Sequence, residues 1–166
     1  MSSRSGVRWK PILAAAAAAV GVAALGASAT ELGPWYQSLV KPSWQPPDWL
    51  FGPAWTLIYA LAAVAGVLAW TNAHGRASRT RILAAFALNA LANVLWSELF
   101  FGFQRPDWAL AEVGLLWFTI VLLMVVLARH SKAASWLLAP YLAWVSFAAL
   151  LNLAVVRLNY PFHATP

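Results

Sequence analysis

Three sets of aromatic and amide side chains recur at the spacing of a helix face, where residues three or four apart lie together. The sets are Phe51, Trp55 and Tyr59; then Asn89, Asn93, Trp96 and Phe100; then Tyr141, Trp144, Ala148 and Asn152. Aromatic faces can stack on a flat molecule, while amides can bond its polar edge. These residue types therefore predict an aromatic, sparsely polar cavity. Contacts between helices, with the asparagines as hydrogen-bonding partners, are an equally good interpretation from spacing alone.

The stretch KPSWQPPDWLFGPAW, residues 41–55, joins two apolar segments and is rich in proline and tryptophan. A residue that precedes proline is pushed out of helical geometry. We therefore expect an extended, stiff connection over about residues 31–48, with Trp35, Trp44 and Pro47 placed to cover the cavity as a lid. In the alternative interpretation the tryptophans only anchor the chain at a membrane interface.

The usual catalytic and metal-binding groups are sparse. The chain has no cysteine, and its histidines lie in connections or in the tail, so the sequence predicts no metal site and no resident cofactor. Glu98 and Glu112 are expected at helix ends, where Glu98 either reaches the interface or pairs with Arg105. No acid–base pair suggests enzymatic chemistry. A small-solute channel or transporter is a further alternative, although the chain is poor in the charged or broken helices expected of one.

Long uncharged runs must position these side chains. They occupy residues 11–30, 49–73, 82–97, 113–128 and 133–156, and a bilayer core requires about 20 apolar residues per helix. We therefore predict an all-α membrane protein, a single domain of five transmembrane helices at about 11–30, 49–73, 82–104, 108–128 and 133–157. The first run can also be interpreted as a signal peptide, because Ala27 and Ala29 form an A-x-A pattern.

The formal net charge is +6, which in a soluble protein would suggest a nucleic-acid partner. Here most basic residues fall in connections that five helices would place on one side: Arg4, Arg8, Lys10, Arg76, Arg79, Arg81, Arg129 and Lys132. The positive-inside rule then places the N-terminus in the cytoplasm. The sequence thus predicts a multi-pass protein of a bacterial cell membrane, with the lipid bilayer rather than nucleic acid as its partner.

Four segments together resemble the translocator protein family, whose bacterial members are called tryptophan-rich sensory proteins. They are WYQSLVKPSWQPPDWLFGPAWTLIYALAAVAG, LNALANVLWSELFFG, DWALAEVGLLW and WLLAPYLAWVSFAALLNLAVVRLN. The similarity covers about residues 9–159, with all segments in order.

The resemblance implies a five-helix bundle, often a homodimer, that binds porphyrins such as haem, sterols or other rigid hydrophobic molecules. Carried over by motif position, the pocket residues are Trp55, Asn89, Tyr141, Trp144 and Ala148, closed by the loop of Trp35, Trp44 and Pro47. Transport of the ligand or tetrapyrrole-linked regulation would follow from binding. Trp55 and Trp144 match tryptophans linked in some relatives to light-dependent porphyrin breakdown. One departure is Leu153, which stands where relatives with a sterol motif have tyrosine, and sterol recognition there is therefore not expected.

Overall fold

A computed structural model describes residue 21 and residues 33–162. Four of its helices are long and apolar enough to cross a membrane, at Asp48–Asn72, Arg76–Gly102, Pro106–Ala128 and Lys132–Asn159. The described residues form helices and connections without a strand, so the predicted all-α class is confirmed for this part of the chain. The span expected at 11–30 lies outside the described residues, apart from residue 21.

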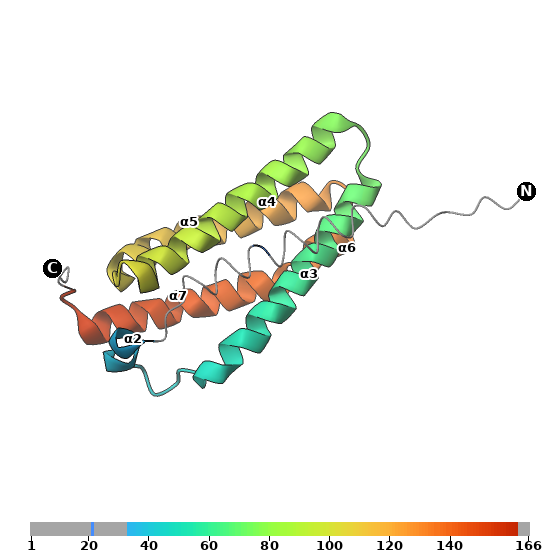
Figure 1. The fold of residues 1–166 in the computed structure, drawn as a ribbon. Coiled ribbons are helices and arrows are strands. Elements are labelled where there is room, and N and C mark those ends of the chain that lie inside the picture. Colours follow the sequence, from blue (N-terminus) through green and yellow to red (C-terminus); the bar gives the residue numbers. More distant parts are fainter. Residues whose placement is uncertain (1–20, 22–32, 163–166) are drawn as a thin grey trace, which may run out of the picture.

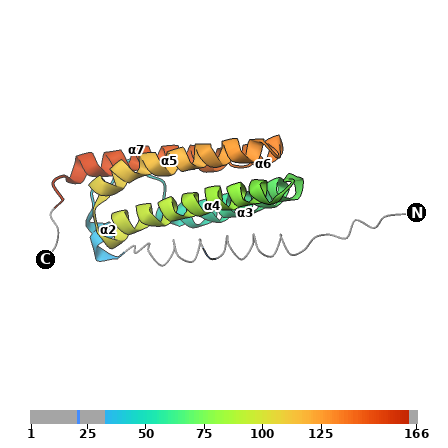
Figure 2. The same cartoon turned by 90° about the horizontal axis from the view of Figure 1, so that it is seen from above.

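The helices run back and forth along one long axis (Figure 1). In order they are α2 (Pro34–Ser38), η1 (Asp48–Leu50), α3 (Phe51–Asn72), α4 (Arg76–Ser97), η2 (Glu98–Gly102), α5 (Pro106–Ala128), α6 (Lys132–Trp136) and α7 (Ala139–Asn159). Figure 2 shows α3 and α4 in one layer and α5, α6 and α7 in a second layer. The first connection and the η2 turn therefore lie at one end of the protein, and the α3–α4 connection lies at the other.

Two helix boundaries differ from the sequence expectation. The helix expected from residue 82 begins at Arg76, because a helix continues past the apolar run that the hydropathy pattern detects. The helix expected over 133–157 is interrupted between α6 and α7 at residues 137–138. Pro140 lies in the first turn of α7, where its missing N–H costs little, and it could not continue a preceding helix without losing a hydrogen bond.

The first connection is also not extended throughout. Residues 34–38 form the short helix α2, which starts at a proline in its first turn. Proline is well tolerated there because the first N–H groups of a helix have no partner within the helix. Beyond α2 the chain runs irregularly, with one turn in which the Gln45 N–H donates to the Pro42 carbonyl at 3.0 Å. The first connection is therefore partly helical and partly irregular with a turn, not extended throughout.

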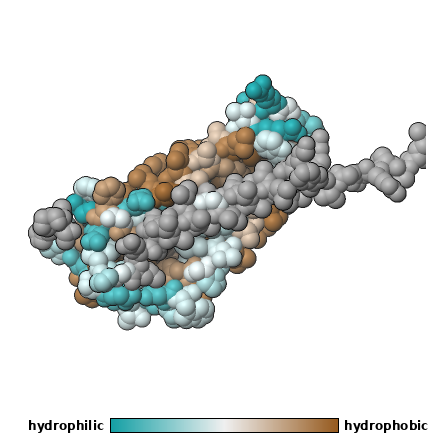
Figure 3. Space-filling model, viewed as in Figure 1, coloured by the Kyte–Doolittle hydropathy of each residue, from teal (hydrophilic) through white to brown (hydrophobic). Residues whose placement is uncertain are grey.

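Small residues pack the second half of α3. Ala65 and Ala69 are fully buried there, and a Cβ on Gly66 would approach the Phe86 ring of α4 to 3.3 Å. Small side chains allow close helix packing within a membrane. The larger side chains of the core come mainly from α5: Leu116, Ile120, Leu123 and Leu127. Outside this core, Figure 3 shows an apolar band between two hydrophilic ends, as a membrane-spanning protein requires.

Candidate ligand-binding site

Helices α3 and α7 bring their predicted aromatic residues together near the first connection. The ring of Phe51 lies edge-on to Trp144, with centroids 5.6 Å apart. Trp55 lies edge-on to Tyr141 at 6.0 Å and stacks on Tyr59 at 5.4 Å. Tyr141 is buried, whereas the other members are half-buried. The spacing pattern therefore marks side chains that form one cluster, whose outer ring faces remain partly accessible.

The predicted amides are used for hydrogen bonds between helices. The Tyr59 hydroxyl donates to Asn93 Oδ1 at 3.0 Å, and Asn93 Nδ2 donates to the Tyr141 hydroxyl at 3.1 Å. Asn89 Nδ2 donates to Thr119 Oγ1 of α5 at 3.0 Å, a partner that the sequence pattern did not identify. Both asparagines are buried. Asn93 joins two tyrosines of the aromatic cluster, whereas Asn89 joins α4 to α5, and the interpretation as hydrogen-bonding partners between helices describes both.

Trp96 belongs to a neighbouring aromatic group at the end of α4. It stacks on Phe100 at 5.3 Å, and its Nε1 lies 3.4 Å from Asn152 Oδ1. Trp35, from α2, meets the edge of Phe100 at 6.1 Å. Trp35 and Trp96 are thus joined through Phe100 rather than through Trp55 or Trp144.

The first connection reaches the same helices. Trp44 lies edge-on to Phe147 of α7 at 5.8 Å, and Phe147 is 5.7 Å from Trp144. Pro47 is exposed just before η1, and Ala148 is half-buried on α7. Half of the Trp44 surface is exposed. The loop therefore contacts the outer side of the aromatic cluster through Trp44.

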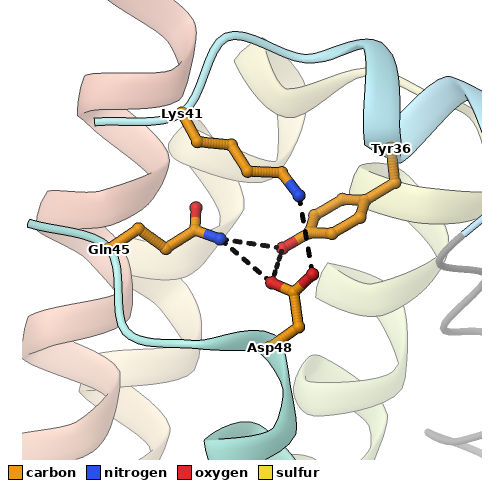
Figure 4. A network of polar contacts seen from close by, with 4 residues as sticks. All are labelled: Tyr36, Lys41, Gln45 and Asp48. Carbon is orange, nitrogen blue, oxygen red and sulfur yellow. Dashed lines mark hydrogen bonds and ion pairs between the residues drawn. The ribbon is translucent and has the colours of Figure 1, made fainter. Parts of the chain in front are cut away.

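A network of polar contacts stabilises the first connection (Figure 4). Tyr36 donates to Asp48 Oδ1 at 3.2 Å, and Gln45 Nε2 lies 3.1 Å from the same oxygen and 3.3 Å from the Tyr36 hydroxyl. Lys41 Nζ lies 3.6 Å from Asp48 Oδ2 and 3.9 Å above the centre of the Tyr36 ring. Burial, with the nearby Asp48 charge, raises the pKa of Tyr36 to about 12. The network joins α2 to η1, just before α3, so fewer residues of the connection are left without side-chain contacts.

A second contact fastens the loop to the end of α7. The Val40 N–H donates to Asn159 Oδ1 at 2.8 Å, and Asn159 Nδ2 donates to the Val40 carbonyl at 2.9 Å. One side chain therefore satisfies both backbone groups of a loop residue. Nothing in the sequence pattern indicated this pair, because the partners are far apart along the chain.

The structure corrects the helix-end placement of Glu112 and one of the two alternatives for Glu98, its pairing with Arg105; the other alternative is compatible with the exposed position of Glu98. Arg105 pairs with Asp107, whose Oδ1 accepts from Arg105 Nε at 2.8 Å, and Glu98 has no ion pair among the residues that the structure describes. Glu112 is buried within α5 rather than placed at a helix end. Its carboxylate oxygens have no hydrogen-bond partner within the described part of the chain. A lone acid in an apolar helix was the available signal for Glu112, since such groups usually face the protein interior.

The fold and the cluster define an all-helical membrane-spanning protein with an aromatic site at one end. The sequence profile of the TspO/MBR family matches residues 13–158. The tryptophan-rich protein TspO of Chlorobaculum tepidum is 46% identical over 130 residues, covering 75% of this chain and 79% of that protein. The protein of the same name from Archaeoglobus fulgidus is 43% identical over 141 residues, covering 85% and 90%. The human translocator protein is 35% identical over 127 residues, covering 76% and 75%.

The chain therefore belongs to the TspO/MBR family, and the resemblance inferred from its motifs is confirmed. Family membership and the apolar helices together make it an integral, multi-pass membrane protein that lies in a lipid bilayer. Its bacterial relatives support a bacterial membrane.

Proposed function

We propose that this protein binds flat hydrophobic molecules, porphyrins first among them, at the aromatic cluster of α3 and α7. The observation that carries the proposal is the meeting of Phe51 with Trp144 and of Trp55 with Tyr141 from two helices. A porphyrin is planar and apolar with acidic edges. Half-buried indole faces offer a surface for its ring, and such stacking contributes about 0.5–1.5 kcal/mol beyond the burial of area.

The buried amides support the site in this proposal rather than touching the ligand. Asn93 holds the hydroxyls of Tyr59 and Tyr141, which fixes two rings that both contact Trp55. A preformed site loses less conformational freedom on binding than a flexible one. The loop residue Trp44 then closes over the ligand from the side of Phe147, and ligand transport or tetrapyrrole-linked regulation would depend on this closure.

Titration of the purified protein with protoporphyrin, followed by the fluorescence anisotropy of the porphyrin itself, tests the proposal. Trp144→Ala should weaken binding by at least about fivefold, because it removes both a stacking face and buried apolar area. The matched control is Trp136→Ala in α6, since Trp136 is exposed and outside the cluster. Equal losses in the two variants would indicate partitioning into detergent and would contradict the proposal. A sterol titrated in parallel tests the alternative ligand class.

Light-dependent breakdown of a bound porphyrin is the second candidate. The half-buried position of Trp55 inside the cluster favours it, because a porphyrin bound there would lie next to an indole that can donate an electron to its photoexcited ring. Trp55→Phe keeps an aromatic face but removes the easily oxidised indole. If Trp55 is the donor, this variant should bind porphyrin but lose its absorbance more slowly under illumination. Equal rates in the variant and the wild type would exclude a role for Trp55 in the reaction.

The proposal also includes a fifth transmembrane helix over about residues 11–30, a cytoplasmic N-terminus and a homodimer. Reporter fusions at the two chain ends should lie on opposite sides of the membrane. Intact mass of the membrane-extracted protein should show that the first span is retained. Light scattering of the detergent-solubilised protein should give the mass of two chains.

A further inference from the structure

An open cavity of about 590 Å³ lies at the end of the protein opposite the aromatic cluster, where α3 joins α4. It is lined by Trp70, Ala73, His74, Gly75, Arg76, Arg79, Thr80 and Leu83. This cavity shares no residue with the proposed porphyrin site. In Figure 3 hydrophilic residues gather at this end, directly beside the apolar band. The cavity therefore lies at the expected level of the lipid headgroups.

The positive charge of this end has no counter-charge in the described part of the chain. Both described ion pairs, Lys41–Asp48 and Arg105–Asp107, lie at the opposite end. Neither the second half of α3, nor the connection, nor the first half of α4 contains an acidic residue. Arg129, which follows α5, and Lys132, the first residue of α6, add to the charge of the same end. An anion from outside the protein would therefore be attracted here.

Arg79 is held in position while one of its donors, the buried Nε, has no hydrogen-bond partner in the described part of the chain. Its guanidinium lies 5.2 Å from the centre of the Trp70 ring, so the aromatic face orients it. Arg79 Nε is buried and has no hydrogen-bond partner among residues 33–162. A buried donor without a partner costs free energy, and an incoming acceptor would remove that cost. The planar guanidinium matches the oxygens of a phosphate well.

The start of α4 adds a second reason to expect an anion. The first turn of a helix carries partial positive charge and favours acidic residues. Here the first turn contains no acid, and Arg76 and Arg79 stand there instead. Gly75, which precedes the helix, offers no side chain to cap its N–H groups. A bound phosphate would offset the repulsion that this arrangement creates.

We propose that this cavity binds the phosphate of an anionic phospholipid headgroup. Trp70 and the exposed side chain of Leu83 provide apolar contacts that a free phosphate ion would not use, but that the glycerol and first methylenes of a lipid would. Basic pockets between transmembrane helices are known to hold anionic headgroups in general. The lack of an acidic residue disfavours a zwitterionic lipid, whose ammonium group would meet only positive charge.

Native mass spectrometry of the full chain, titrated with phosphatidylglycerol or with phosphatidylcholine of the same acyl chains, tests the proposal. Arg79→Gln should weaken phosphatidylglycerol binding by about tenfold, the loss expected for a charge-assisted hydrogen bond. The matched control is Arg81→Gln. Arg81 lies two residues after Arg79 in α4 but does not line the cavity. It should lose less than about fivefold, the general contribution of one charge near an anionic lipid.

Equal losses in Arg79→Gln and Arg81→Gln, or equal binding of the two lipids, would overturn the proposal. Displacement of the lipid by an equal concentration of inorganic phosphate would assign the cavity to a soluble anion and would overturn it as well. If Arg79→Gln lowers the melting temperature, Arg76→Gln replaces it, since Arg76 is exposed and lines the same cavity. That variant should also lose more affinity for phosphatidylglycerol than Arg81→Gln does, and an equal or smaller loss would contradict the site.

Discussion

Replacing Asn159 by alanine is expected to loosen the first connection without unfolding the protein. The Asn159 amide makes both hydrogen bonds to the backbone of Val40, at 2.8 and 2.9 Å. A hydrogen bond contributes about 0.5–1.5 kcal/mol net. More than half of the Val40 surface is exposed, so water competes and the lower part of this range applies. The two bonds together should then stabilise the closed loop by about 1–2 kcal/mol.

Amide hydrogen exchange of the loop peptides measures this directly, because exchange from a locally open state follows the free energy of opening. A loss of about 1–2 kcal/mol should speed exchange at Val40 by about 5–30-fold. The melting temperature should change little, since α7 keeps its own backbone hydrogen bonds. If the loop is the lid of the binding site, release of protoporphyrin should speed by a similar factor, because affinity changes within one interface appear mainly in the off-rate.

Asn72→Ala is the matched control. Asn72 also lies at the end of a long helix, but its amide donates to the Leu68 carbonyl of its own helix. This change should leave the loop exchange unaltered. An unchanged exchange rate at Val40 in Asn159→Ala, or the same increase in both variants, would refute the reasoning. Faster exchange with an unchanged release of porphyrin would instead show that the loop is fastened by Asn159 but is not the lid.

Three further predictions follow from buried or crowded groups. Glu112→Met should raise the melting temperature, because both carboxylate oxygens lack a partner in the described part of the chain. An unsatisfied buried group costs about 1–3 kcal/mol. A lower melting temperature would show that the carboxylate has a stabilising partner. Gly66→Leu should destabilise the protein in the same assay, since even a Cβ approaches Phe86 to 3.3 Å; Gly114→Leu is the control, because no atom lies within 4 Å of a Cβ at that position. Burial raises the pKa of Tyr36 to about 12, so the contribution of Tyr36 to loop stability should be complete below pH 10 and lost toward pH 12. The tyrosinate absorbance that Tyr36→Phe removes should titrate near pH 12. A midpoint near pH 10 would contradict this.

The sequence predicted the residues that form the cluster better than it predicted their partners. Helical spacing identified Trp55, Tyr141 and Trp144 because a helix presents every third or fourth residue on one side. It did not show that Asn89 would bond to Thr119, since that pair depends on how two helices are rotated against each other. The interpretation of the amides as a cavity lining or as helix–helix contacts was open for the same reason.

The helix ends were also only partly predictable. The hydropathy pattern marks the residues that lie in the apolar bilayer core. A helix, in contrast, extends as far as its backbone hydrogen bonds continue, which can be beyond that core. Thus α4 begins at Arg76, well before its apolar run, and the last span is interrupted before Ala139. The proline in the first turn of α7 marked this break, but a proline in a long apolar run is also compatible with a continuous, kinked helix.

Composition and spacing by themselves determined that this chain crosses a membrane as helices, whereas its motifs carried only a resemblance to one family. The physical reason is local: the backbone must satisfy its own hydrogen bonds in lipid, and uncharged runs of sufficient length leave no alternative to the helix except a barrel. The tertiary structure decided which polar groups find partners. It joined Val40 to Asn159, left Glu112 without a partner in the described residues, and placed Arg79 over Trp70 beside a cavity. Such pairings depend on distances between helices, which no single stretch of sequence contains.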